Sequence, residues 1–255
     1  MAANWQVAWV TGASSGIGRE VALQLAARGA KVAISARSTD KLAEIARGNS
    51  ACHVYPLDVT DQAATSATVA AIERDLGAID LAVLNAGTWE PAKVKDLKPE
   101  AVAHAMAVNY QGVVNGIAAL LPSMIARQSG HLGLVASVAG YRGLPRAGGY
   151  GPTKAALINL AETLAGELPA QGVSVSLINP GFVATPMTAG NTFPMPFMVQ
   201  ADDAARRIVR GLERGRFEIA FPWQLVALLK LARVLPYPLY FWIVRNVLAK
   251  ERQPD

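Results

Sequence analysis

The stretch Thr11-Gly12-Ala13-Ser14-Ser15-Gly16-Ile17-Gly18 lies between an apolar run, residues 6–10, and a segment of helical periodicity, residues 18–28. Glycine permits a tight turn and close approach of the backbone to a pyrophosphate, and a helix start offers free N–H groups. A strand-to-helix turn can also need glycine for purely conformational reasons, so the loop alone is weak evidence. Its place after the first strand of an alternating chain predicts a dinucleotide-binding loop.

Strand-like and helix-like segments alternate along the rest of the chain. Short apolar runs rich in β-branched residues predict strands at residues 31–35, 53–56, 79–84, 131–136, 173–178 and 217–220. Helical periodicity marks residues 61–76, 99–125 and 153–168. This order predicts a single α/β domain, a Rossmann-like doubly wound parallel sheet with helices on both faces. Ligands are then expected beyond the carboxyl ends of the strands.

Length, apolar content and the few cysteine and histidine residues indicate what kind of protein this is. The chain has 255 residues, 52% of them hydrophobic, which is enough for one substantial core, and we assign residues 1–220 to it. Its single cysteine, Cys52, excludes an intramolecular disulfide and fits a reducing compartment. Its few histidines and one cysteine lack the paired spacing of a zinc site, so no metal is expected. The start of the chain lacks the features of a secretory signal, so we expect a cytoplasmic protein.

The glycine spacing T-G-x-x-x-G-x-G resembles the dinucleotide loop of the short-chain dehydrogenase/reductase family. Gly12, Gly16 and Gly18 match its glycines. The resemblance implies that the loop, with Ser14, Ser15 and Ile17, binds a nicotinamide dinucleotide.

The residue that recognises the adenine ribose differs from that of an NAD enzyme. An acidic residue is expected there about two dozen residues after the loop, yet the second strand ends in Ala36-Arg37. An arginine fork pairs with a 2′-phosphate, whereas a carboxylate repels it. The sequence therefore predicts NADP(H) over NAD(H), unless Arg37 is only a solvated residue before a helix.

Two further strand ends resemble cofactor elements of the family. Asp58 and Val59 follow the third strand, where the family has an aspartate that meets the adenine amino group; Asp58 has an alternative role as a helix cap. The fourth strand ends in Asn85-Ala86-Gly87, similar to an N-A-G element that lines the adenine ribose and ties the sheet together.

Tyr150 and Lys154 are four residues apart, which places them on one face of a helix start. A phenol has a reference pKa of about 10, and a nearby ammonium is expected to lower the pKa toward the working range. Alone, this pair is common by chance. Ser137, thirteen residues before Tyr150, has the spacing seen in the family and is expected to polarise the substrate oxygen. Asn109 matches the family's asparagine, which implies a link from Lys154 to solvent through a water.

The segment after the sixth strand resembles the family's P-G-x-x-x-T element beside the nicotinamide. Pro180, Gly181, Val183 and Thr185 match it, and Val183 and Thr185 are expected at the carboxamide. The resemblance thus covers residues 5–185 in order. It implies hydride transfer between the cofactor and a carbonyl or secondary alcohol, and a homodimer or homotetramer.

Beyond residue 185 the family gives less guidance. A substrate lid is expected at about residues 188–215, where Phe193, Met195, Phe197 and Met198 either contact an apolar substrate or pack the lid down.

The last segment, residues 221–255, is expected to be an apolar, basic helical extension. Residues 219–250 contain no acidic residue. A helical wheel from Trp223 places Lys230 and Arg233 on one side and the leucines at 225, 228, 231 and 235 on the other. Prolines and basic residues interrupt the apolar run, which argues against a spanning helix. Two interpretations remain for residues 221–250: a hairpin in the inner surface of a membrane, or a cover over a subunit interface or the substrate pocket.

The sequence thus predicts an NADP(H)-dependent oxidoreductase for a small, apolar carbonyl or alcohol. The alternative is a non-catalytic dinucleotide-binding or membrane-associated module on the same fold. The net charge is +5, but the clustered basic residues are interleaved with bulky aliphatic residues and do not form an exposed polar face. This argues against nucleic acid as a partner.

Overall fold

The computed structural model describes residues 5–90 and 94–248. Its main sheet has seven parallel strands in the order β3-β2-β1-β4-β5-β6-β9. The strands are β1 (Val7–Thr11), β2 (Lys31–Ser35), β3 (Cys52–Val54), β4 (Leu81–Leu84), β5 (Gly130–Val135), β6 (Val173–Pro180) and β9 (Glu218–Phe221). Strand order reverses between β1 and β4, which places the ligand crevice at their carboxyl ends. The predicted doubly wound parallel sheet is confirmed.

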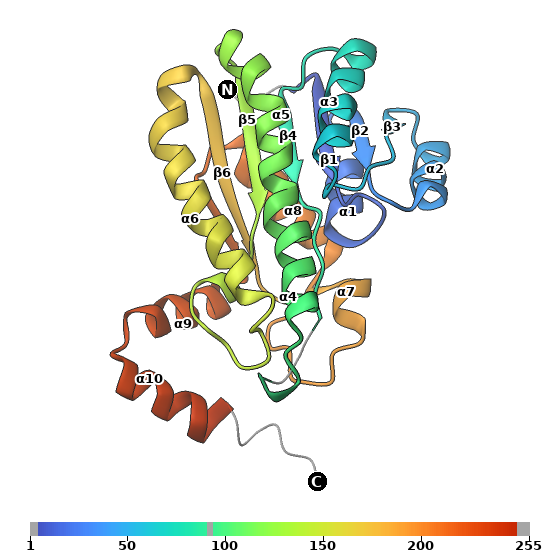
Figure 1. Cartoon of the computed structure of the whole chain (residues 1–255). Helices are drawn as coiled ribbons and strands as arrows, with labels where there is room; N and C mark the ends of the chain where they lie inside the picture. The colour runs from blue at the N-terminus through green and yellow to red at the C-terminus, as the bar shows by residue number, and fades with distance from the viewer. Residues whose placement is uncertain (1–4, 91–93, 249–255) are drawn as a thin grey trace.

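Helices cover both faces of the sheet (Figure 1). One face packs against α1 (Gly16–Ala26), α2 (Thr39–Gly48) and α8 (Ala201–Glu213). The other packs against α3 (Gln62–Leu76), α5 (Gly112–Ala126) and α6 (Gly151–Glu167). Strands buried on both faces need near-continuous apolar sequence, which is why β1, with all five residues buried, reads Val-Ala-Trp-Val-Thr.

The expected single helix over residues 99–125 is interrupted. Helix α4 (Pro99–Met106) passes into a π-helical turn, Ala107–Gln111, before α5 begins. Such turns insert one residue into a helix and often occur at functional sites. Here the turn carries Asn109, whose buried side chain bonds to a neighbouring loop and to α6. The periodicity of the sequence continues through one inserted residue, so it did not predict this turn.

The expected lid over residues 188–215 is wrong in its second half. Helix α8 lies within it, and its buried face, including Ile208, Val209 and Leu212, packs in the core beside α1. Before α8 lie the short helix α7 (Pro186–Ala189) and a two-stranded sheet of β7 (Val183–Ala184) and β8 (Val199–Gln200). Only residues up to about 200 are therefore candidates for a lid.

The chain ends in an arm of two helices, α9 (Trp223–Val234) and α10 (Tyr237–Ile243), which continues in a π-helical turn, Val244–Leu248. The helical wheel misplaced its buried face, because Leu225 and Leu229 are buried while Leu228 and Leu231 face solvent. No helix in the described part of the chain has both the length and the hydropathy that crossing a bilayer requires.

Candidate active site

The glycine loop folds tightly against the ends of β1 and β4. Gly12 and Gly16 adopt φ values of +65° and +55°, a region that side chains rarely enter. A Cβ atom on Gly18 would lie 2.4 Å from the carbonyl oxygen of Gly12 and 2.5 Å from Asn85 Nδ2. The loop thus presents backbone where a side chain would otherwise stand, as close approach of a pyrophosphate requires.

Asn85 and Thr11 hold this loop in place. Asn85 Nδ2 donates to the carbonyl oxygens of Thr11 (3.0 Å) and Gly12 (3.3 Å). Thr11 Oγ1 accepts from the backbone N–H groups of Asn85 (2.9 Å) and Ala86 (3.0 Å). The N-A-G element therefore ties β4 to the glycine loop, as its resemblance to the family implies.

A cavity of about 350 Å³ lies over this loop. Most of the predicted cofactor-binding residues line it: Gly12, Ser14, Ser15, Gly16, Ile17, Arg37, Asp58, Val59, Asn85, Ala86, Gly87 and Thr185. Gly18 lies beneath the loop instead, and the buried side chain of Val183 belongs to β7. A contact between Val183 and a nicotinamide would therefore use its main chain. The loop geometry and this lining fit a dinucleotide.

Asp58 is not the cap of the following helix. Asp61, not Asp58, caps α3, because its Oδ1 accepts from the backbone N–H of Ala64 at 2.8 Å. Asp58 Oδ1 accepts from the backbone N–H (3.0 Å) and hydroxyl (2.8 Å) of Thr60, and these bonds lower the pKa of Asp58, as does the charge of Arg37. Asp58 is thus a fixed carboxylate in the cofactor cavity.

Tyr150 and Lys154 meet at the start of α6. Lys154 Nζ lies 5.5 Å from the centre of the Tyr150 ring and donates to the carbonyl oxygen of Val135 at 2.9 Å. The lysine is buried, at 3% exposure, and its pKa falls to about 7 for that reason. The two side chains therefore lie close together, as their four-residue spacing predicts.

The expected lowering of the Tyr150 pKa is wrong. Burial raises the pKa of Tyr150 to about 12, and a hydrogen bond with Ser137 lowers it only in part. The reason is that the lysine stands in the same buried place, where its own charge is disfavoured. A helical wheel predicts that two side chains lie close together, but it does not predict how deeply each of them is buried.

Ser137 lies at the end of β5, where its Oγ faces the neighbouring strand. The hydroxyl donates to the carbonyl oxygen of Pro180 at 3.3 Å and accepts from the backbone N–H of Ala139 at 3.1 Å. These bonds place it between Tyr150 and the Pro180–Gly181 segment, so the serine, the tyrosine and the lysine form one group.

Asn109 lies beside this group, fully buried. Its Oδ1 accepts from the backbone N–H of Thr88 at 2.7 Å, and its Nδ2 donates to the carbonyl oxygen of Thr88 and to Thr153 Oγ1. A Cβ atom on Gly87 would lie 3.3 Å from Asn109 Oδ1 and 3.7 Å from Lys154 Nζ. The asparagine therefore joins the loop after β4 to α6, next to the lysine.

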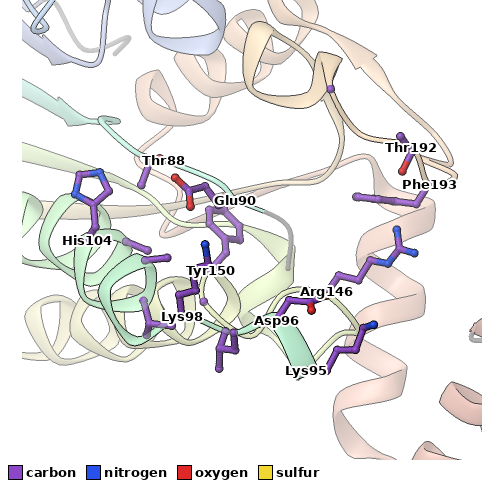
Figure 2. A pocket seen from close by; sticks show the side chains of 16 residues that line it. Thr88, Glu90, Lys95, Asp96, Lys98, His104, Arg146, Tyr150, Thr192 and Phe193 are labelled. Atoms are coloured by element: carbon purple, nitrogen blue, oxygen red, sulfur yellow. The ribbon is translucent and has the colours of Figure 1, made fainter. Parts of the chain in front are cut away.

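A second cavity, of about 640 Å³, opens over Tyr150. Figure 2 shows His104 at one end, Arg146 and Phe193 at the other, and Tyr150 between them. Three loops contribute to its lining: Thr88 and Glu90 after β4, Arg146 and Gly149 before α6, and residues 190, 192 and 193 before β8. Met195, Phe197 and Met198 are not among the lining residues, and Phe197 and Met198 are exposed.

The sequence did not point to several residues of this cavity. Residues 95–98 and the first turns of α4 line it, as does Arg146, which adopts a positive φ of 64°. Trp89 stands edge-on to the Tyr150 ring, with ring centres 5.0 Å apart, and donates from Nε1 to Asn191 Oδ1 at 3.0 Å. An aromatic residue two positions after the N-A-G element was the available signal for Trp89.

Comparisons with known proteins agree with this geometry. The family model described as short chain dehydrogenase matches residues 6–193. The chain is 40% identical to an uncharacterized oxidoreductase of Myxococcus xanthus, over 93% of this chain and 95% of the relative. It is 36% identical to an uncharacterized oxidoreductase of Staphylococcus epidermidis, over 81% and 90%. The fold also matches the crystal structure of a short-chain dehydrogenase from Streptomyces avermitilis, with a TM-score of 0.82, 24% identity and full coverage of both chains.

The fold and site define a dinucleotide-dependent oxidoreductase. The chain belongs to the short-chain dehydrogenase/reductase family, whose members bind a nicotinamide dinucleotide.

Proposed function

We propose that the protein is an NADP(H)-dependent reductase or dehydrogenase that interconverts a carbonyl and a secondary alcohol. The observation that supports this most directly is the group under the second cavity: Tyr150, which lines that cavity, with Lys154 Nζ 5.5 Å from its ring and Ser137 beside it. Thr88 and His104 line both cavities, so a substrate over Tyr150 would stand next to a dinucleotide on the glycine loop.

The proposed chemistry follows from these positions. When bound, the reduced nicotinamide supplies the hydride that the carbonyl carbon accepts. Ser137 Oγ holds the carbonyl oxygen, and the Tyr150 hydroxyl gives its proton to that oxygen as the C–H bond forms. Lys154 orients the phenol and the nicotinamide ribose. Asn109 links Lys154 to solvent through a water; because the Asn109 amide already bonds to Thr88 and Thr153, the π-helical main chain is the better partner for that water.

The preference for NADP(H) rests on Arg37. The exposed guanidinium lines the cofactor cavity beside Ser38, and no carboxylate stands at positions 36–38. Its charge is close enough to lower the pKa of Asp58. A 2′-phosphate at this place would accept charge-assisted hydrogen bonds from Arg37.

For the substrate we propose a hydrophobic carbonyl compound. Leu97, Val102, Phe193 and the Tyr150 ring give the second cavity its apolar parts, and charged side chains stand among them. We further propose a homodimer or homotetramer in the cytoplasm, with no nucleic acid partner and with peripheral association at the inner face of a membrane.

The test follows NADPH absorbance with a panel of aliphatic, steroid and long-chain ketones. We expect turnover of at least one apolar ketone, and loss of turnover by about a thousandfold or more in Tyr150→Phe with little change in NADPH binding. Thr163→Val, on the outer end of α6, is the control and should keep full activity. Undiminished turnover in Tyr150→Phe would contradict the assignment and favour a non-catalytic binding module.

A further inference from the structure

The α9–α10 arm exposes an unusual amount of apolar surface. Trp223 is 73% exposed and Val234 76%, and six more large apolar residues of the arm are exposed: Leu228, Leu231, Tyr237, Leu239, Phe241 and Trp242. Contiguous apolar patches of this kind on a folded protein mark sites of binding to another protein or to a membrane.

Helix α9 carries two separate apolar stripes. Leu225 and Leu229 face the body and are buried in its core. Trp223, Leu231 and Val234, with Ala227 between them, recur at spacings of three and four and face solvent. A helix that needed only to cover the sheet would have a polar outer face, so this outer stripe requires a separate explanation.

The charges of the arm all have one sign. Residues 219–250 hold four basic residues and no acidic one. Lys230 pairs with Glu218 of β9, whereas Arg233 is exposed and Arg245 lies over the Phe241 ring at 5.9 Å. Tyr237 and Phe241 stack with ring centres 5.8 Å apart. Aromatic rings beside arginines are typical of helices that lie at a lipid–water interface.

The arm is attached to the loop that carries the active site. Arg142 Nη1 donates to the carbonyl oxygens of Ala232 and Arg233 at the end of α9 and of Leu235 just beyond it, and its guanidinium stacks on the Tyr240 ring at 4.1 Å. Tyr240 Oη also donates to the carbonyl oxygen of Gly143. The same loop contributes Arg146 and Gly149 to the wall of the substrate cavity. In Figure 1 the arm lies at the end of the molecule where the loop between β5 and α6 lies.

We infer that α9 and α10 form a plate that lies in the surface of an anionic bilayer and holds the mouth of the substrate cavity against it. The outer apolar stripe and the aromatic residues enter the headgroup region, and Arg233 and Arg245 contact lipid phosphates. The part of this inference that concerns substrate entry rests on the proposed function. It implies that the substrate is a membrane-dissolved carbonyl compound, delivered along the lipid surface.

A second copy of the chain fits this surface less well. In a two-fold interface the same patch meets itself, so the basic residues of one arm would face those of the other. The arm offers no carboxylate to separate them. Anionic headgroups supply the missing negative charge, at about 1 kcal/mol per basic residue near the surface.

The test is co-sedimentation of the whole protein with vesicles of phosphatidylcholine alone or mixed with phosphatidylglycerol. We expect binding to the anionic vesicles, weakened about tenfold or more in Leu231→Glu/Val234→Glu and about fivefold in Arg233→Gln. Ala67→Glu/Ala70→Glu is the matched control, because these residues are exposed on α3 with the same spacing. This control should bind as the unaltered protein does.

Two outcomes would overturn the inference. One is equal binding of Leu231→Glu/Val234→Glu and the unaltered protein. The other is absence of vesicle binding by the unaltered protein; a self-association, seen in analytical ultracentrifugation, that the same double variant abolishes would then assign the surface to a second copy of the chain. Turnover of a water-soluble ketone without vesicles is measured in parallel. Absence of vesicle binding by the unaltered protein, with that turnover intact, refutes only the membrane plate, and vesicle binding without any turnover refutes only the proposed function.

Discussion

The two cavities that meet at Thr88 and His104 are built in different ways. One wall of the cofactor cavity is the backbone of the glycine loop, which is packed so tightly that a side chain at Gly18 would collide with Gly12 and Asn85. The substrate cavity is made of side chains from three loops and the start of α4. A site made of backbone tolerates almost no added atom, because nothing in it can rotate away. A site made of side chains can change its ligand without loss of the fold.

Gly18→Ala tests the tightly packed glycine loop and should weaken cofactor binding more than any of the changes that follow. The new Cβ would lie 2.4 Å from the Gly12 carbonyl oxygen, so the loop must shift. We expect NADPH binding to weaken by more than about a hundredfold, measured by fluorescence titration. Gly48→Ala, where no atom lies within 4 Å of the new Cβ, is the control and should bind NADPH normally. Normal binding by Gly18→Ala would show that the loop is more pliable than its packing indicates.

The effect of pH on activity, set by the Tyr150 pKa, should be nearly as large and should differ between alcohol oxidation and ketone reduction. Because burial raises the pKa of Tyr150 to about 12, the protonated phenol needed for reduction is present throughout pH 7 to 9. Oxidation needs the phenolate, whose fraction rises tenfold per pH unit below that pKa. We expect kcat/KM for alcohol oxidation to rise about a hundredfold from pH 7 to 9, while that for ketone reduction does not rise. A flat oxidation profile would contradict a raised pKa in the free enzyme.

Arg37→Asp should discriminate between the two cofactors. Loss of charge-assisted bonds to a 2′-phosphate should raise the KM for NADPH roughly 10- to 100-fold, with less than about a threefold change for NADH. Arg47→Asp makes the same charge change near the far end of α2 and should alter neither. Equal changes in both KM values would remove the argument for NADP(H).

Substitution of Trp89, which packs on Tyr150 beside the substrate cavity, should give the smallest effect. Trp89→Ala removes both the ring packed on Tyr150 and the bond to Asn191, so we expect the KM for ketone to rise about tenfold with the KM for NADPH unchanged. Trp89→Phe keeps a ring and should show only a part of this rise. If both variants change kcat and leave KM as it was, Trp89 positions Tyr150 and does not contact the substrate.

The order of strands and helices followed from the sequence because buried parallel strands need continuous apolar runs, and helices need a 3.6-residue period. The glycine loop was also predictable, since glycine is placed there by local backbone geometry. Ser137, Tyr150 and Lys154 were predictable as a group through their spacing. The contact of Trp89 with Asn191 was not predictable, because the two residues are 102 positions apart.

Local sequence thus determined which segments form strands, where the chain must turn on glycine, and which polar groups stand at strand ends. These properties depend on neighbours along the chain. The tertiary structure decided which face of α9 is buried, that the helix carrying Asn109 contains a π-helical turn, and that Lys154 and Tyr150 are desolvated enough to shift their pKa values. Those depend on which surfaces meet after folding, and hydration, which sets a pKa, is a property of the assembled surroundings and not of a residue or its spacing.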